Sequence, residues 1–556
     1  MSNPAPPPTS TPPADAGAGA HRPGLAKRVF WPSAILIIGF VLAASLLPEQ
    51  MNNALEKANE TVVNTIGWYY VLLTFFFVAF CLWLAVSEYG QIRLGRDDEE
   101  PEFGYLSWFA MLFSAGMGIG LMFWGVAEPL YHFAGPPPGV LGPDPSSADA
   151  ANAAMGRTFL HWGLHAWAIY IVVGLGVAYA VHRKMLPVSI RWALRPLLGR
   201  RVEGWLGDVI DVVAIVGTLF GVATSLGFGV SQVAAGLDFM GVVDGSSAWL
   251  QVLLIAGITL IATGSVVSGI GKGIKWLSNT NLTLAALLLL FVLIAGPTLF
   301  LLNDMVQSIG YYLQNFFRMS FSTMAYQEEG PAWLGGWTTY YWGWWISWSP
   351  FVGVFIARIS KGRTVREFIT GVLLVPTLLT TAWFVIMGGT ALHREIFGDG
   401  GMVAEDGSVS TNEALFQMLD SLPGGPFLAG LAIVMIVIFF VTSSDSGSYV
   451  VDMIANGGHP DPPLWSRVMW SVLEGAIAAV LIVAGAVAGV EGGGLASLQT
   501  MAILTAAPFT VVMIGICLSL VRAFAQEMRE HHRVERAMLA RELVIEAQEQ
   551  GLHPRS

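Results

Sequence analysis

Apolar runs of about the length that crosses a bilayer recur along this 556-residue chain and leave it few possible folds. A helix needs roughly 20 apolar residues to span the hydrocarbon core and satisfies its backbone hydrogen bonds internally. With 54% hydrophobic and only 12% charged residues, the chain is predicted to be an all-α membrane protein with twelve transmembrane helices. The runs are 30–48, 66–88, 105–126, 155–181, 207–238, 247–269, 279–302, 335–356, 367–390, 425–450, 465–490 and 499–523.

Basic residues gather in the connections that follow even-numbered runs, such as Arg183, Lys184 and Arg191 after the fourth. Because Lys and Arg favour cytoplasmic loops, both termini are expected in the cytoplasm. Odd connections such as 391–424 lean acidic, so most of the formal net charge of -11 lies outside or in the C-terminal tail. This charge suggests no nucleic-acid partner.

Glycines interrupt the third run at Ser114-Ala115-Gly116-Met117-Gly118-Ile119-Gly120. Each Gly costs about 1 kcal/mol relative to Ala in a helix, so we expect the helix to unwind here. Unwound backbone at membrane depth lines a cavity or is buried in protein, and its carbonyls can coordinate a cation. The alternative is a seam of small residues for close helix packing.

The eighth and tenth runs carry the second half of this pattern. The eighth has an irregularity at Ser347-Trp348-Ser349-Pro350, and paired interruptions are typical of carriers built from inverted repeats. The tenth supplies hydroxyls at Thr442 and Ser443, suited to a hard monovalent ion, followed by Asp445. Such hydroxyls also often bond back to their own helix, which is the competing interpretation.

Four tryptophans lie within seven residues of the eighth run, at Trp342, Trp344, Trp345 and Trp348. At about 100° per residue they are related by i, i+3 and i, i+4 steps, so we expect them to converge. Indole faces attract a cation that carries no hydrogen-bond donor, which makes a quaternary ammonium the first ligand to consider. Interface belts and plain helix packing are the alternatives.

Together these residues resemble the betaine/choline/carnitine transporter family from about residue 30 to 525. Four motifs carry the resemblance: Gly116 to Gly125 with Glu128-Pro129, His161-Trp162-Gly163-Leu164-His165-Ala166-Trp167-Ala168-Ile169-Tyr170, Trp342 to Gly353, and Thr442 to Ser446. The resemblance implies inverted five-helix repeats of the amino-acid/sodium symporter type. It also implies a homotrimer in the cytoplasmic (inner) membrane.

The resemblance also divides the chain. We expect a disordered cytoplasmic tail at 1–28, two peripheral transmembrane helices at 29–104, a first repeat at 105–302 and a second at 335–523. A periplasmic segment at 303–334 connects the repeats. Residues 524–556, which alternate in charge, are expected to form a cytoplasmic helix that is either a solubilising tail or a regulatory arm.

Substrate residues follow from the family's aromatic box, which corresponds to Trp162, Trp167 and Tyr170 on the fourth run and Trp344, Trp345 and Trp348 on the eighth. The resemblance implies that these rings hold a trimethylammonium group while the backbone around Met117, Gly118 and Gly120 meets a carboxylate. Similar carriers of zwitterions have Gly at position 120, where choline carriers tend to have Asp. The substrate is therefore expected to be glycine betaine or a sulfonium analogue.

A sodium site is implied at the backbone oxygens of Ser114, Met117 and Phe439 and the hydroxyls of Thr442 and Ser443. A second ion site of the family corresponds to Thr218 and Phe351. Val222 stands where that site would have its second hydroxyl, so we expect it to be weak, rebuilt by Thr224, or absent.

The predicted function is sodium symport of a betaine-type substrate by alternating access, with no cofactor beyond the coupling ion. A proton-coupled choline or carnitine carrier or exchanger of the same family is the alternative. A passive channel or a membrane enzyme is less favoured, because neither a Gly-x-Ser-x-Gly nor a His-Glu-x-x-His motif is present. His161 and His165 are expected to pack or hydrogen-bond rather than bind a metal. Cys81 and Cys517 support neither a disulfide nor a metal site.

Overall fold

The computed structural model describes residues 25–116, 118–140, 147–268, 271–489 and 494–549. Its elements are all helices, and an isolated bridge between Arg93 and Thr364 is the one β-type pairing found among these residues. The all-α prediction is confirmed. In chain order the helices are α1 (Lys27–Leu46), α2 (Pro48–Val86), η1 (Glu88–Gln91), α3 (Tyr105–Gly116), α4 (Ile119–Ala134), α5 (Ser147–Trp162), α6 (Leu164–Ala178), η2 (Tyr179–Arg183), α7 (Ile190–Ala193), α8 (Arg195–Leu198), η3 (Gly199–Glu203), α9 (Trp205–Phe239), α10 (Ala248–Ser268), α11 (Gly271–Ala295), α12 (Thr298–Ser320), α13 (Gly330–Gly336), α14 (Thr338–Ile359), α15 (Val365–Phe397), α16 (Ala414–Asp420), α17 (Gly425–Ala455), α18 (Leu464–Val487) and α19 (Gly494–Glu549).

Ten of the described helices are long and apolar enough to cross a membrane, or eleven if the bent pair α3–α4 counts as one span. The prediction was twelve. The remaining expected span corresponds to α14, whose 22 residues include many Trp, Tyr, Gly and Ser residues, and these lower its mean hydropathy below that of the other spans. At about 1.5 Å per residue α14 is still roughly 33 Å long, which is enough to cross the hydrocarbon core.

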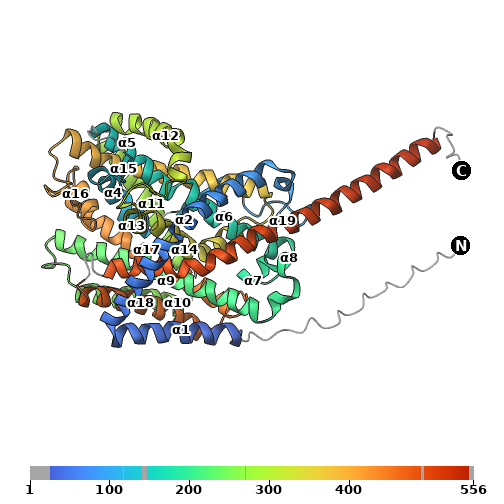
Figure 1. The fold of residues 1–556 in the computed structure, drawn as a ribbon, viewed down its shortest axis with the longest axis horizontal. Helices are drawn as coiled ribbons and strands as arrows, with labels where there is room; N and C mark the ends of the chain where they lie inside the picture. The colour runs from blue at the N-terminus through green and yellow to red at the C-terminus, as the bar shows by residue number, and fades with distance from the viewer. Residues whose placement is uncertain (1–24, 117, 141–146, 269–270, 490–493, 550–556) are drawn as a thin grey trace, which may run out of the picture.

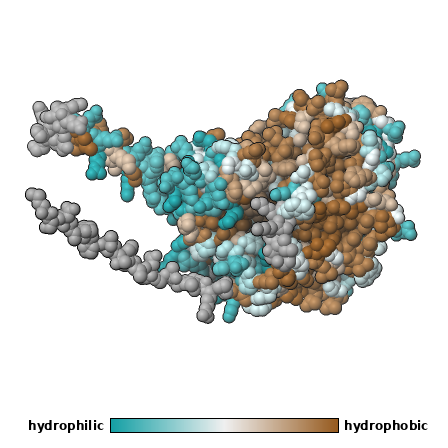
Figure 2. Space-filling model, turned by 180° about the vertical axis from the view of Figure 1, so that it is seen from behind, coloured by the Kyte–Doolittle hydropathy of each residue, from teal (hydrophilic) through white to brown (hydrophobic). Residues whose placement is uncertain are grey.

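Burial separates central helices from lipid-facing ones. In the most apolar stretch of the α5–α6 segment 89% of the residues are buried, and in α9 78%, whereas the values for α10 and α11 are 28% and 22%. Hydrophobic side chains cover most of the body in Figure 2, and hydrophilic ones gather toward the end from which α19 projects. A protein with this distribution is solvated by lipid around its body and by water at its ends.

The helix break predicted at the glycine run is present. α3 ends at Gly116, α4 begins at Ile119, and the two helices are bent by 69°. Gly118 is extended, with φ -168° and ψ -173°. The break leaves the N-terminus of α4 pointing into the centre of the bundle, where α4 packs against α5, α9 and α15.

The interruption expected at Ser347–Pro350 is wrong, because α14 runs unbroken through Pro350. Pro350 has no N–H to give to the carbonyl of Ile346, four residues earlier. The hydroxyl of Ser349 donates to that carbonyl at 2.7 Å instead, so the helix continues without an orphaned acceptor.

A break that the sequence did not suggest lies in the fourth run, where Gly163 separates α5 from α6 with φ -98° and ψ -131°. A Cβ at this position would lie 2.5 Å from the carbonyl oxygen of Phe159, so glycine is required by space. The indole N–H of Trp345 donates to the carbonyl of His161 at 2.8 Å, and the hydroxyl of Thr380 donates to that of Trp162 at 3.2 Å. These two bonds tie the break to α14 and α15.

The last expected span and the charged tail form one helix, α19, which crosses the body and projects beyond it (Figure 1). Within the body α19 packs against α9, α14 and α18. α14 in turn packs against α6 and α9, so the helix that carries the tryptophans lies at the centre of the molecule.

Candidate functional site

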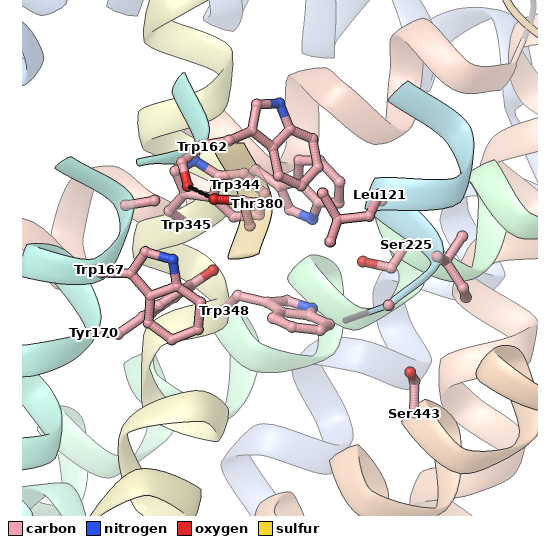
Figure 3. A pocket seen from close by; sticks show the side chains of 14 residues that line it. Leu121, Trp162, Trp167, Tyr170, Ser225, Trp344, Trp345, Trp348, Thr380 and Ser443 are labelled. Carbon is pink, nitrogen blue, oxygen red and sulfur yellow. Dashed lines mark hydrogen bonds between the residues drawn. The ribbon is translucent and has the colours of Figure 1, made fainter. Parts of the chain in front are cut away.

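A cavity at the centre of the bundle is lined mainly by aromatic side chains from α5, α6 and α14, facing the start of α4 (Figure 3). Every described residue of the predicted substrate set lines it: Gly118, Gly120, Trp162, Trp167, Tyr170, Trp344, Trp345 and Trp348. Met117 lies outside the described residues. Their part in substrate binding stays a prediction, but the structure brings them together around one space.

Five further lining residues were not anticipated: Ile119, Leu121, Ala166, Ser225 and Thr380. Three of them follow directly from the predicted motifs, since Ile119 and Leu121 flank Gly120 and Ala166 precedes Trp167. Ser225 on α9 and Thr380 on α15 carried no sequence signal, because a single hydroxyl residue in an apolar run is common. No lining residue of this cavity, among those the structure describes, is charged.

The rings form a connected wall. Trp344 and Trp345 are stacked with centroids 4.5 Å apart and planes at 17°, and Trp162 meets Trp345 edge-on at 4.9 Å. Tyr170 extends the wall, with its centroid 5.3 Å from that of Trp167 and 6.2 Å from that of Trp345. Stacked and edge-on pairs at these distances are the favoured aromatic geometries, so each of these rings is stabilised by its neighbours.

Trp342 does not line the cavity, and the prediction that it converges with the other three tryptophans is wrong. Its indole stacks on the ring of His165 at 5.3 Å and meets His161 edge-on at 5.9 Å. The packing alternative therefore applies to this residue. Neither ring nitrogen of His165 has a hydrogen-bond partner within the described part of the chain.

Glu128 on α4 is the centre of a polar cluster that includes His161 and was not recognised from the sequence as part of the site. Its carboxylate is fully buried and accepts hydrogen bonds at Oε2 from the indole of Trp162 at 2.6 Å and the hydroxyl of Tyr341 at 2.5 Å. Its Oε1 lies 2.7 Å from Nδ1 of His161 and 3.3 Å from Nε2 of His132. The carboxylate therefore fixes the orientation of a ring that lines the cavity.

A metal site is the alternative for Glu128, His132 and His161, because their ligand atoms lie within 4.8 Å of one another. However, the carboxylate-to-imidazole distances are those of hydrogen bonds, and the second oxygen is already occupied by Trp162 and Tyr341. The geometry favours the hydrogen-bonding role for His161.

A second cavity adjoins the aromatic one and shares Trp348 and Ser443 with it. Four residues of the predicted sodium set line this second cavity: Ser114, Phe439, Thr442 and Ser443. The hydroxyl of Thr442 donates to the carbonyls of Ile438 at 2.9 Å and Phe439 at 3.2 Å, so its lone pairs remain available to a cation. The structure thus places the four described residues of the predicted ion set beside the aromatic cavity, and their binding of sodium stays a prediction.

The second predicted ion site is not assembled in this way. Phe351 lines the second cavity, but Thr218 is fully buried in α9, lines neither cavity, and donates to the carbonyl of Ala214 at 2.7 Å. Thr224 is likewise bonded to backbone carbonyls, those of Phe220 and Leu498. Among the described hydroxyl side chains of α9, Ser225 is the one that lines either cavity, and the cavity it lines is the aromatic one.

Residues 28–529 match the profile of the BCCT family, the betaine/carnitine/choline family transporters. The chain belongs to this family. It is 52% identical over 497 residues to an uncharacterized transporter of Mycobacterium tuberculosis, covering 89% of this chain and 82% of the relative. It is 43% identical to the glycine betaine transporter OpuD of Bacillus subtilis, covering 91% and 96%, and 44% identical to glycine betaine transporter 1 of Vibrio parahaemolyticus, covering 92% and 95%.

Among solved structures, a manganese transporter mutant of Eremococcus coleocola is similar over 75% of this chain and 81% of that one, with a TM-score of 0.41 and 15% identity. The family membership confirms that this chain is a transporter of the BCCT family and not an enzyme.

Proposed function

We propose that this BCCT transporter imports a zwitterionic quaternary ammonium or sulfonium osmolyte, with glycine betaine first, by sodium symport through alternating access. The observation that carries the proposal is the aromatic cavity, whose described lining holds five indoles and a phenol and no charged side chain. A low-dielectric space without a counter-charge favours a solute whose own charges cancel. Choline carries a net positive charge, and no negatively charged side chain of the described lining would balance it.

The two ends of a zwitterion have separate partners in this cavity. The ring faces around Trp345 suit the methylated cation, since they attract charge without requiring hydrogen bonds. α4 begins at Ile119 beside the cavity, and the first N–H groups of a helix have no partner within it. Those N–H groups and the positive end of the helix dipole suit the carboxylate.

Sodium coupling is supported by the shared wall of the two cavities. Trp348 and Ser443 face both the aromatic space and the space lined by Ser114 and Thr442. A sodium ion that fixes the side chain of Ser443 would change the affinity of the aromatic cavity for its substrate. By linkage, bound substrate would change the affinity for sodium by the same factor.

A third cavity supports a route toward the cytoplasm. It shares Phe351, Phe355 and Ser446 with the second cavity and continues to the basic residues Arg358 and Arg467. Basic residues mark the cytoplasmic side. We propose on this ground that the series of cavities is the inward half of an alternating-access pathway, and that both termini lie in the cytoplasm.

The test is uptake of labelled glycine betaine into proteoliposomes with and without an inward sodium gradient, with choline, carnitine and dimethylsulfoniopropionate as competitors. We expect accumulation that requires sodium and is blocked by the zwitterions only. Because position 222 is Val and Thr218 lines neither cavity, we propose a single sodium site and expect a Hill coefficient near one for the sodium dependence. A coefficient near two would contradict the single site, and uptake indifferent to sodium would favour proton symport or exchange.

A homotrimer in the cytoplasmic membrane is proposed from family resemblance. Native mass spectrometry of the protein in lipid nanodiscs tests this proposal. The mass of three subunits per particle is expected, and the mass of one or two would contradict it.

A further inference from the structure

A carboxyl group lies buried in the contact between α9, α17 and α18, and it lines none of the three cavities described above. Glu474 stands in the middle of α18, a candidate membrane span, and its side chain is completely inaccessible to solvent. The hydroxyl of Ser444 on α17 donates to its Oε2 at 3.0 Å. Its Oε1 has no hydrogen-bond partner within the part of the chain that the structure describes.

An ionised carboxylate in this place would be very unfavourable. Burying an unpaired charge costs far more than burying a hydrogen-bonded neutral group, and acidic side chains inside membranes mark ion or proton pathways. One neutral hydroxyl does not compensate a full negative charge. The group therefore needs a cation, and a bound proton is the smallest.

The surroundings favour a proton over sodium. Oε1 faces Gly447, where an added Cβ would lie 3.2 Å from Oε1 and 3.1 Å from a methyl carbon of Val222. A sodium ion needs several oxygen ligands, whereas this side of Oε1 is lined by Gly447 and the methyl groups of Val222. A proton needs one oxygen, and Oε1 is free to take it.

The charged groups near Glu474 do not neutralise it. Asp445 on α17 acts on it electrostatically but is itself paired with Arg467 of α18 at 3.1 Å. α9 faces it with Val222, and α10 packs against α18 with the hydroxyls of Thr259 and Thr263. No basic side chain among the described residues forms an ion pair with Glu474.

We infer that Glu474 is a proton-binding site of the transport cycle, placed beside Val222, where the second sodium site of the family has lost its hydroxyl. Resting on the proposed function, this makes one proton, rather than a second sodium ion, the additional coupling ion. An O–H bond forms at Oε1 with a proton from the outside when the substrate site is loaded. It breaks when α17 and α18 rearrange and the proton passes to water on the inside.

Infrared difference spectroscopy of the protein in lipid tests the site without any transport. The wild type minus Glu474→Gln spectrum is expected to contain the C=O stretching band of a carboxylic acid, absent from the variant. Absence of that band at every pH at which the protein stays folded would overturn the assignment. Because this readout needs no substrate, it remains decisive even if wild type transports no betaine and the proposed function fails.

Coupling is tested in proteoliposomes with equal sodium on both sides and an interior more alkaline by one pH unit. One coupled proton raises the equilibrium accumulation of labelled glycine betaine about tenfold in the wild type, since a tenfold ratio corresponds to about 1.4 kcal/mol. Glu474→Gln is expected to exchange labelled for unlabelled betaine yet show no accumulation driven by the pH difference. Wild-type accumulation that ignores the pH difference, or a variant that responds like wild type, would overturn the coupling.

Two further variants separate titration from packing. Glu474→Asp keeps a carboxyl group and should retain the response to the pH difference, whereas a purely structural role predicts that Asp and Gln fail alike. Glu413→Gln, which neutralises a half-buried acid preceding α16, should respond as wild type does. If Glu474→Gln instead lowers the number of coupled sodium ions, the site binds sodium and the proton assignment is wrong.

Discussion

The indole of Trp162 owes its orientation to a buried carboxylate as well as to its aromatic neighbours. Glu128 accepts its N–H at 2.6 Å and also accepts from Tyr341, so one side chain holds two rings of the central cluster. Each buried donor left without an acceptor costs about 1–3 kcal/mol. At the scale of single residues, the shape of the cavity therefore depends on a group that does not line it.

We expect Glu128→Leu to weaken glycine betaine binding tenfold or more, because it removes the acceptor for Trp162 and Tyr341 at once. Glu128→Gln has a side chain of the same length with one acceptor oxygen, so it should retain most of the affinity. The affinities of both variants are measured by the quenching of tryptophan fluorescence on addition of substrate. Equal affinities for the Leu variant and the wild type would show that packing alone holds Trp162.

Gly120 is constrained by the same rings. A Cβ there would lie 2.8 Å from Trp344 and 2.9 Å from Trp162, so any side chain must displace an indole. Gly120→Ala is expected to lower betaine affinity about tenfold through crowding alone, at roughly 1–3 kcal/mol. Gly120→Asp adds a negative charge and should shift preference toward choline. Competition assays decide, and a loss of both substrates in the Asp variant would leave space as the only role of Gly120.

At the scale of elements, the continuity of α14 predicts that its proline is replaceable. Pro350→Ala restores an N–H for the carbonyl of Ile346, so we expect transport to persist and thermal stability to hold or rise. Ser349→Ala removes the substitute donor and should cost about 1 kcal/mol in the free energy of unfolding. Thermal unfolding in detergent measures both, and loss of transport in Pro350→Ala alone would mean that the cycle needs a break there.

The helix elements also show what a sequence can predict and why. The run from Gly116 to Gly120 predicted its break because three glycines lower helix stability whatever surrounds them. Gly163 is a single glycine, and its break depends on Trp345 and Thr380, which come from distant segments. Pro350 led to the opposite error, because it predicted a break where the helix continues. The hydroxyl of Ser349 takes the place of the missing N–H at the carbonyl of Ile346. The aromatic cavity could be predicted from the family's motifs, whereas Glu128 and Glu474 became visible only through their neighbours in space.

At the scale of the whole molecule, α19 is fastened to the body by Glu527. Its carboxylate accepts from Arg183 at 2.8 Å and from Tyr179 at 3.0 Å, and it also pairs with Lys184. Glu527→Ala should therefore lower the unfolding temperature, since charged hydrogen bonds contribute about 1.5–3 kcal/mol.

The residues from Glu535 to Glu546 are exposed. A chain that ends at residue 532 should therefore keep full uptake and thermal stability. If osmotic upshift activates uptake in the wild type and not in the truncated chain, the regulatory arm is favoured over the solubilising tail.

The unbroken path of α19 has a mechanical consequence. Its part beyond residue 524 extends roughly 35–40 Å at 1.5 Å per residue, with no proline or glycine to absorb bending. A tilt of about 10° inside the bilayer would swing the far end of such a rod through roughly 6 Å. The exposed part of α19 therefore enlarges small tilts of its membrane-embedded part. A spin label near Glu546 would detect movements of the transport core that are too small to measure with a label placed beside the tryptophans.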